Sequence, residues 1–482
     1  MKKSIKRNAL LNGLKQCVTL VYGLITIPYV SRILGSENYG KINFGSSIIS
    51  YFTMIAALGI STYAVREGAG KRDDKKKLTK FSNEVFTINI LSTIVSYTLF
   101  FILLAEWQRI RDYRIQMLIQ VAPILFITLG VDWINIIYED YFYITIRYII
   151  VHIVSVALLF LFVKSADDYL KYVGLISMTS IIANATNVYY IKKRYLYPKL
   201  VLKTNYRKHI VPLIILFFNA LTISIYVESD KTILTIFETD AVTGVYSIAV
   251  SIYTIIKTFM NAVLSVSLPR ISSYVASNRC KEYEELLHRL LHAIFVFLLP
   301  AIAGLFMLSP QIILLVAGKD YLGATWALRI LSFALLFGSI AYFLVYAILI
   351  PFKKEKYCFF TTVLSAILNV TLNILLIPII SLNGAAATTL LSESLVVGLG
   401  ILFARKIISF VPNAKSLIPS VIGTLLVWGV CSIISCLVQS AAWCLIISVS
   451  ISIIVYSLCL LIFKDSLIWA MVKNCMKMKG KK

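Results

Sequence analysis

Residues 290–317 read LLHAIFVFLLPAIAGLFMLSPQIILLVA and contain no Asp, Glu, Lys or Arg. A helix that crosses a membrane needs about 20 mainly apolar residues, so this stretch is long enough to span a bilayer. The rest of the chain is similar, because 59% of its 482 residues are hydrophobic, only 15% are charged, and the mean hydropathy is +0.84. Soluble domains are about half apolar. The composition therefore predicts an integral membrane protein.

Similar apolar stretches recur along the chain with short polar segments between them. They predict an all-α polytopic membrane protein with about fourteen transmembrane helices. The candidate spans are Ala9–Leu34, Ile42–Val65, Phe81–Ala105, Ile115–Tyr138, Tyr148–Val163, Tyr172–Ile191, Ile210–Asp230, Ala241–Leu264, Leu290–Ala317, Ala324–Ile350, Tyr357–Ile377, Gly384–Ala404, Ser416–Leu437 and Trp443–Phe463.

The 47 Lys and Arg residues outnumber the 23 Asp and Glu residues, giving a net charge of +24. Most of the basic residues lie in every second loop, counted from the N-terminus. These segments are Lys2–Arg7, Arg66–Lys80, Lys192–Lys208, Arg270–Arg289, Lys353–Lys356, Arg405–Lys415 and the tail from Lys464. Cytoplasmic loops of membrane proteins are enriched in Lys and Arg, so we expect both termini in the cytoplasm. A nucleic-acid binder would instead carry one basic stripe, and that class is excluded.

A weak internal repeat divides the chain. Shifting the sequence by 204 residues aligns Gly40 with Gly244 and Arg66 with Arg270. The shift maps spans one to six onto spans seven to twelve, so both halves have one orientation, as in transporters built from parallel repeats. We therefore expect two parallel-related six-helix bundles followed by two C-terminal helices. The expected domains are an N-terminal bundle at 1–191, a basic cytoplasmic linker at 192–208, a C-terminal bundle at 209–406, and two extra helices with a basic cytoplasmic tail at 407–482.

Six stretches, taken together in this order, resemble the Wzx-type polysaccharide repeat-unit flippases of the multidrug, oligosaccharidyl-lipid and polysaccharide exporter superfamily. The resemblance covers the chain from residue 1 to about residue 406. The stretches are PYVSRILGSENYGKINF (28–44), LGISTYAVREGAGKRDDKKKL (58–78), VDWINIIYEDYFYITIR (131–147), YVESDKTIL (226–234), TGVYSIAVSIYTIIKTFMNAVLSVSLPRIS (243–272) and IPFKKEKY (350–357).

This resemblance implies two six-helix bundles around a central cavity and transport by alternating access. It implies that a polyprenyl-diphosphate-linked oligosaccharide is flipped from the inner to the outer leaflet of the bacterial cytoplasmic membrane, for capsule, exopolysaccharide or another cell-surface polysaccharide. We expect a monomer in contact with membrane lipid, with glycosyltransferases and a polysaccharide polymerase as partners.

Charged side chains inside the spans are the candidates for substrate binding, because such groups are costly in lipid and usually face a polar interior. Lys257 lies about sixteen residues into its span and Lys15 about six into the first span, so a diphosphate could bind both. For either lysine, the alternative is a side chain that snorkels to the membrane surface. Arg66 and Arg270, the repeat-related pair, either anchor their helices or guide an anionic headgroup into the cavity.

Acidic residues near span ends are candidates for gating or ion coupling. Asp230 and Glu228 end the seventh span beside Lys231, and a local ion pair is the alternative role. Asp132 is a weaker candidate of the same kind. In each case a carboxylate that pairs in one state and is released in another would act as a two-state switch.

The sequence predicts no catalytic residue, metal site or cofactor, since it has no C-x-x-C, no His at metal-ligand spacing and no G-x-x-x-x-G-K-[ST] loop. Two other functions remain open. A cation-coupled multidrug or metabolite antiporter would share the fold, although its cavity should favour acidic residues. A membrane-embedded glycan polymerase is a weaker candidate, because such enzymes usually present a large external loop and every outer loop here is short.

Overall fold

We describe a computed structural model that places residues 5–201, 206–265, 267–408, 414–465 and 467–469. These residues form helices and connecting turns, with no β-strand among them. The chain divides into two compact units, Met1–Gly244 and Val245–Lys482, which we call unit 1 and unit 2 and describe separately. Most of the predicted basic tail (470–482) and part of the predicted linker (202–205) lie outside the described residues.

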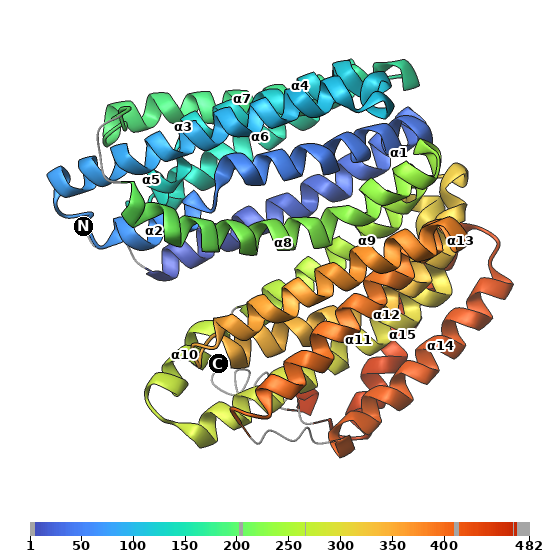
Figure 1. Cartoon of the computed structure of the whole chain (residues 1–482). Helices are drawn as coiled ribbons and strands as arrows, with labels where there is room; N and C mark the ends of the chain where they lie inside the picture. Colours follow the sequence, from blue (N-terminus) through green and yellow to red (C-terminus); the bar gives the residue numbers. More distant parts are fainter. Residues whose placement is uncertain (1–4, 202–205, 266, 409–413, 466, 470–482) are drawn as a thin grey trace, which may run out of the picture. The chain divides into compact units, whose positions relative to one another are not determined.

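Unit 1 contains eight helices and the start of a ninth, and Figure 1 shows them from blue to green. Helix α8 runs alongside α1, and α4 packs against α7. The elements are α1 (Ile5–Ala57), α2 (Ile60–Ala69), α3 (Lys75–Glu106), the 3₁₀ turn Gln108–Tyr113, α4 (Arg114–Gly130), α5 (Asp132–Ile137), α6 (Tyr141–Phe162), the 3₁₀ turn Ala166–Asp168, α7 (Tyr169–Arg194), α8 (Arg207–Phe237) and α9 (Asp240–Ser265), which continues into unit 2.

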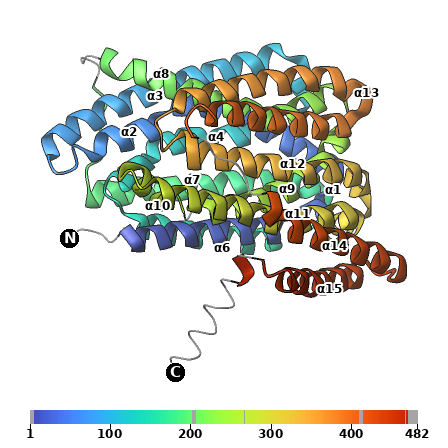
Figure 2. The ribbon, with the colours of Figure 1, turned by 90° about the horizontal axis from the view of Figure 1, so that it is seen from below.

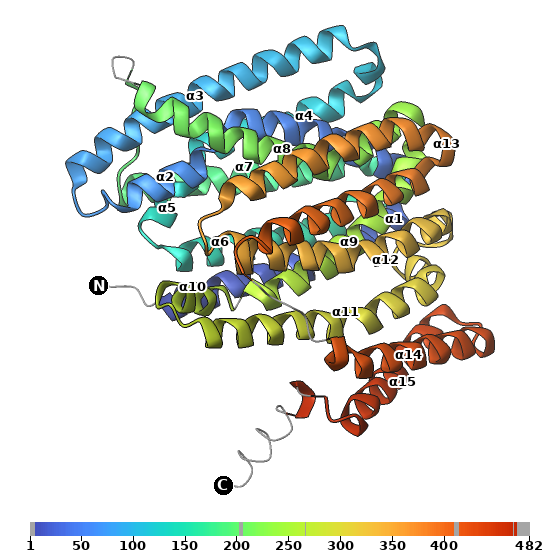
Figure 3. The same ribbon diagram turned by 60° about the horizontal axis from the view of Figure 1, so that its bottom comes forward.

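Unit 2 is built around α11, α12 and α13, while α14 and α15 pack against each other and against α11 (Figures 2 and 3). Its elements after α9 are α10 (Leu268–Ala276), α11 (Cys280–Val316), the 3₁₀ turn Lys319–Ala324, α12 (Thr325–Phe343), the π-helical turn Leu344–Leu349, α13 (Glu355–Ala404), the 3₁₀ turn Ala414–Leu417, α14 (Ile418–Leu437) and α15 (Ala441–Ile462).

Eleven helical stretches of the described chain are long and apolar enough to cross a membrane. Two of them are long enough for two crossings, Leu10–Ala69 with 60 residues and Glu355–Ala404 with 50. Each is broken by non-helical residues, at Gly35 in α1 and at Ile380 and Ser381 in α13. Counting each as two crossings and adding α7, which is less apolar, would give the expected fourteen. That number stays a prediction.

The candidate span Ile115–Tyr138 is wrong as a single helix. Val131 has a left-handed backbone (φ 43°) and separates α4 from α5. Asn187 of α7 donates to the freed carbonyl of Gly130 over 2.6 Å, which satisfies an acceptor that the helix no longer pairs. The second candidate span, Ile42–Val65, is also interrupted, because α1 ends at Ala57 and α2 begins after Gly59.

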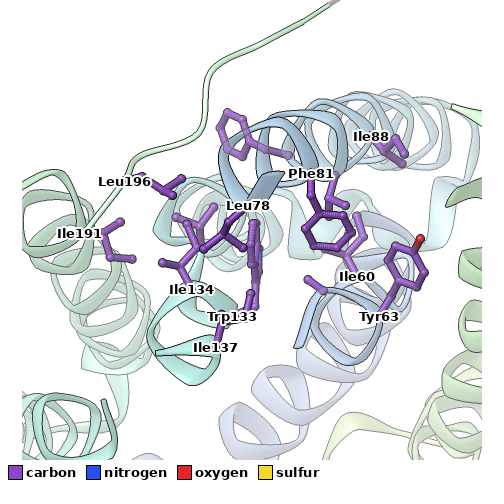
Figure 4. Packing of buried hydrophobic residues seen from close by; sticks show 14 of the residues in the cluster. Ile60, Tyr63, Leu78, Phe81, Ile88, Trp133, Ile134, Ile137, Ile191 and Leu196 are labelled. Atoms are coloured by element: carbon purple, nitrogen blue, oxygen red, sulfur yellow. The ribbon is translucent and has the colours of Figure 1, made fainter. Parts of the chain in front are cut away.

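A buried cluster holds α2, α3 and α5 to the end of α7 (Figure 4). Phe81 and Leu78 of α3 lie between Ile60 and Tyr63 of α2 and Trp133 of α5. Close packing of these side chains therefore holds the four helices of the cluster together.

Helices α1 and α9 cross with their backbones in contact, within unit 1. A β-carbon added to Gly40 would lie 1.7 Å from the carbonyl oxygen of Asp240, and one added to Gly244 would lie 1.9 Å from that of Ser36. Only glycine allows so close an approach. These glycines are the pair that the 204-residue shift aligns, and each packs against the segment that carries the other. The two units meet in sequence at Gly244, whereas the expected domain boundary at 192–208 stays a prediction.

Candidate functional site

Lys257 of α9 forms an ion pair with Glu393 of α13 in unit 2. Tyr253, one turn earlier on α9, donates a hydrogen bond to the same carboxylate oxygen, Glu393 Oε1, over 3.2 Å. The Lys257 ammonium also lies over the Tyr253 ring, 5.3 Å from its centroid. No carboxylate lies one turn from Lys257 on its own helix. Its acidic partner belongs to a different helix, α13.

Gly338 of α12 makes room for this pair. A β-carbon at Gly338 would lie 2.9 Å from Lys257 Cε, 3.1 Å from Nζ and 3.3 Å from the carboxyl carbon of Glu393. Three helices, α9, α12 and α13, therefore meet at the pair. The side chain of Glu393 is 5% exposed, whereas that of Lys257 is 25% exposed. Lys257 is thus the more exposed side chain of the pair, and the Glu393 carboxylate is almost fully enclosed.

Glu393 was missed at the sequence level, although a signal was present. It is the only charged residue between Gly384 and Ala404, and a lone carboxylate within an apolar span needs a partner or a function. The cationic partner on another helix could not be identified from helical spacing, because that spacing relates only residues of one helix.

Lys15 lies in unit 1, in a row of polar and aromatic side chains between α1 and α6. Its ammonium lies 5.1 Å from the centroid of the Tyr148 ring, and that ring stacks on His152. Tyr22 follows along α1, with its ring edge against His152 and its hydroxyl 3.2 Å from that of Ser155. Lys15 is half-buried, so its expected role in substrate binding stays a prediction.

Arg66 and Arg270 occupy equivalent elements. Each lies in a short helix that follows a long one, Arg66 in α2 and Arg270 in α10, and both side chains are exposed. Arg66 contacts Glu67 at 3.4 Å. Both arginines therefore lie after a helix break, whereas the sequence predicted that each would lie at the end of a continuous span. A role in guiding an anionic headgroup stays a prediction.

Asp230 and Glu228 lie in α8. Asp230 is buried, with 6% exposure. Glu228 pairs with Lys231 at 3.0 Å, and both of these side chains are largely covered. The local ion pair named as the alternative is therefore present for Glu228, while gating or ion coupling at either carboxylate stays a prediction.

Asp132 takes part in a polar network where α5, α6 and α7 meet. Both of its carboxylate oxygens lie 2.7 Å from Arg147 Nη2. Asn187 donates to Asp132 over 2.9 Å, and Asn135 donates to Asn187 over 2.7 Å. Arg147 is only 12% exposed, so Asp132 neutralises an enclosed cation. The role that the geometry supports here is structural, and ion coupling stays a prediction.

A second buried network was not predicted. His209, at the start of α8, lies 2.9 Å from Glu84 of α3 and 2.7 Å from the Tyr63 hydroxyl of α2, which Figure 4 shows beside Phe81. Lys208 reaches the same Glu84 oxygen at 2.7 Å. Glu84 was visible in the sequence as an acidic residue inside the span Phe81–Ala105. The network fastens the first turn of α8 to α2 and α3.

Two apolar cavities open between helices of single units. One of about 380 Å³ lies between α6 and α7, with Arg147 and Tyr143 in its wall, and one of about 470 Å³ lies between α11, α14 and α15. Hydrocarbon chains fit such walls better than polar ligands do. In the described part of the chain, no group of three His, Cys, Asp or Glu residues could hold a metal ion.

Residues 5–275 match the family described as "Polysaccharide biosynthesis protein". The chain belongs to this family. Among relatives, the family member is 25% identical to the O-antigen transporter of Escherichia coli strain K12 over 421 residues, which is 84% of this chain and 97% of that protein. It is 28% identical to the low-salt glycan biosynthesis flippase Agl15 of Haloferax volcanii over 167 residues, which is 35% of each chain.

Solved structures show the same fold. The lipid II flippase MurJ in an inward closed conformation aligns with a TM-score of 0.79 at 18% identity, over 96% of this chain and 99% of that one. An inward-facing transporter of the multidrug resistance MATE family aligns with a TM-score of 0.63 at 13% identity, over 81% and 94% of the two chains. The predicted all-α polytopic transporter fold is confirmed. Relatives named as transporters and flippases also agree with the expectation that this family member is not an enzyme.

Proposed function

We propose that this protein flips polyprenyl-diphosphate-linked oligosaccharide repeat units from the inner to the outer leaflet of the bacterial cytoplasmic membrane by alternating access. Export of this kind would supply capsule, exopolysaccharide or another cell-surface polysaccharide. Membership of the polysaccharide biosynthesis family over residues 5–275 supports the proposal. The 25% identity to a protein named as an O-antigen transporter, over nearly the whole of that protein, supports it further.

The observation that carries the proposal is a lysine well inside an apolar span. The candidate span Asp240–Ala262 contains Lys257, whose side chain is one-quarter exposed. A diphosphate has at least two negative charges, and charge-assisted hydrogen bonds to a partly desolvated cation are among the strong ones. Lys15 is the candidate in unit 1, and Arg66 and Arg270 are proposed to attract the headgroup at the cytoplasmic surface.

The topology belongs to the same proposal. Because the basic loops should face the cytoplasm, both termini would lie there, and Arg66 and Arg270 would lie where substrate enters. Asp230, Glu228 and Asp132 are proposed gating or ion-coupling residues. The proposed partners are glycosyltransferases and a polymerase of the same pathway, with the transporter itself a monomer.

The test uses purified protein in liposomes that contain a short polyprenyl-diphosphate oligosaccharide with a fluorescent label on its sugar. A reductant that cannot cross the membrane quenches the label in the outer leaflet. Active protein should expose the inner-leaflet label as well, and Lys257→Gln should slow this exposure. Lys281→Gln, which changes an exposed lysine of the same unit, is the matched control.

If wild-type protein leaves the inner-leaflet label protected under every ion gradient tested, the proposed function is wrong. The same liposomes test the antiporter alternative, because such a protein should move an organic dye cation against a proton or sodium gradient. Dye transport without movement of the lipid would favour that alternative.

A further inference from the structure

We propose that Glu393 is the counter-ion of Lys257 in the substrate-free protein. The substrate diphosphate replaces Glu393 on the lysine, and Glu393 then takes up a proton. This inference rests on the proposed function and adds to it a specific residue and a coupled proton.

The contacts of Glu393 allow it to lose the lysine and remain satisfied. Its Oε1 atom accepts from Lys257 and also from the Tyr253 hydroxyl at 3.2 Å. When Lys257 moves to another anion, the Tyr253 contact stays in place. A protonated Glu393 keeps that partner, because a carboxylic acid still has acceptor oxygens.

The exposures of the two side chains set the direction of the exchange. Glu393 is 5% exposed and Lys257 is 25% exposed, so in the proposed exchange the anion approaches the pair from the side of the lysine and not from that of the enclosed carboxylate. The lysine ends a flexible four-carbon stem. At Gly338 the backbone of α12 packs closely against the terminal atoms of Lys257, since a β-carbon there would lie 2.9 Å from Cε. In the proposed exchange the ammonium therefore moves away from α12.

The charge balance at the pair favours uptake of a proton. The pair alone is neutral, with one positive and one negative charge. A diphosphate brings at least two negative charges beside an enclosed carboxylate, and like charges at such a place disfavour the ionised carboxylate. A proton from water that binds Glu393 removes one of these negative charges. In the described part of the chain, the titratable groups in contact with Glu393 are Lys257 and Tyr253 of α9, while α12 presents Gly338.

The competing explanation is a structural clamp between α9 and α13, in which Lys257 never leaves Glu393. A clamp and an exchange site make opposite predictions for the neutral variant Glu393→Gln. If the pair is a clamp, Glu393→Gln should lower the stability of the protein and leave its affinity for a diphosphate unchanged or lower. If the pair is an exchange site, Glu393→Gln removes the anion that competes for Lys257 and should raise the affinity for a diphosphate.

The experiment is titration calorimetry of the full-length protein in detergent, with farnesyl diphosphate as the probe. It is repeated at one pH in buffers that have different ionisation enthalpies, so that protons taken up on binding can be counted. Wild type, Glu393→Gln and Lys257→Gln are compared, with Glu285→Gln, an exposed glutamate of α11, as the control. Protonation of the probe itself is common to all variants and cancels in their differences.

Glu393→Gln should bind the probe about tenfold or more tightly than wild type, as expected when a competing charge is removed. Wild type should take up about one proton more per bound probe than Glu393→Gln does. Lys257→Gln should bind weakly, and Glu285→Gln should match wild type. Equal affinity and equal proton uptake in wild type and Glu393→Gln would overturn the inference and leave the proposed function intact. Wild type that neither binds the probe nor moves the labelled lipid would instead contradict the proposed function.

The exchanged variant Lys257→Glu/Glu393→Lys gives a second test if Glu393→Gln proves too unstable to purify. It keeps the pair but moves the cation to the enclosed position. The exchange mechanism predicts a folded protein that neither binds the probe nor transports lipid. Recovery of transport by the exchanged pair would show a structural clamp and refute the inference.

Discussion

Replacing Gly40 with alanine should destabilise the protein more than any ordinary glycine substitution in a helix. The new β-carbon would lie 1.7 Å from the carbonyl oxygen of Asp240, whereas β-carbons are essentially never within 3.0 Å of a heavy atom that belongs to another part of the chain. The two backbones must therefore separate by about 1.3 Å. Neither partner is the movable end of a side chain, so the strain cannot be relieved by a new rotamer.

Overpacking of this kind typically costs about 1–3 kcal/mol, occasionally more, and we expect the upper part of that range. Gly244→Ala, at 1.9 Å from the carbonyl oxygen of Ser36, should behave in the same way. Gly174→Ala in α7 is the control, because a β-carbon added to Gly174 would have no other atom within 4 Å. There the better helix propensity of alanine should leave stability unchanged or raise it by up to about 1 kcal/mol.

The assay is thermal unfolding of the purified protein in detergent, followed by size-exclusion chromatography after heating. A loss of about 3 kcal/mol should lower the unfolding temperature by about 3 °C, because the unfolding entropy of a chain of 482 residues is about 1 kcal/mol/K. The double variant should lose less stability than the sum of the losses of Gly40→Ala and Gly244→Ala, because moving the two helices apart for one methyl group also relieves part of the clash of the other. A Gly40→Ala protein that unfolds at the temperature of Gly174→Ala would refute the backbone contact.

Three further predictions follow from single features of the chain. A reporter domain inserted before α3, in the basic segment Lys71–Lys80 that runs into the first turns of that helix, should lie in the cytoplasm, because the segment is strongly basic; periplasmic activity would contradict the topology. Asp132→Ala should cost about 1–3 kcal/mol of unfolding free energy, because Arg147 stays enclosed without its carboxylate, and adding Arg147→Met should recover much of the loss in a thermal-shift measurement. Hydrogen bonds from Lys171 and neighbouring backbone N–H groups hold the pKa of Asp168 below its usual range. The ionised carboxylate therefore stabilises the fold above about pH 4, and this stabilisation is lost as the pH falls through the pKa of the folded protein. Asp168→Asn should therefore unfold at a lower temperature than wild type at pH 7, and the difference should vanish in acid.

The helices were largely predictable because apolar length alone marks a span. The breaks within the helices were harder to predict. The left-handed turn at Gly59 has a glycine that signals it, whereas Val131 is a β-branched residue that rarely adopts φ 43°. Its conformation depends on Asn187, a residue of another helix that caps the carbonyl of Gly130. Propensity at residue 131 could not reveal a partner 56 positions away in the chain.

The candidate site shows the same limit. Lys257 stood out because charge inside a span is costly, and this reasoning applied equally to Glu393 and Glu84. Which charges meet is a question of packing between helices, and the sequence offers no spacing rule for it. The repeat was more informative than its few identities suggested, since Gly40 and Gly244 were aligned by a shift of the sequence and pack against each other's segments in the fold.

The polarity of α7 has a consequence for how the protein is made. Unlike its neighbours α4 and α6, this helix is not apolar enough to count as a candidate span, and its Asn187 is fully buried among polar partners. A nascent helix of this kind gains little by entering lipid alone. Its amide finds Asp132 and the carbonyl of Gly130 only after the preceding segments are in the membrane. Insertion of α7 during synthesis should therefore depend on helices that the ribosome has already delivered. If the chain is shortened or altered before residue 132, α7 should fail to insert into the membrane.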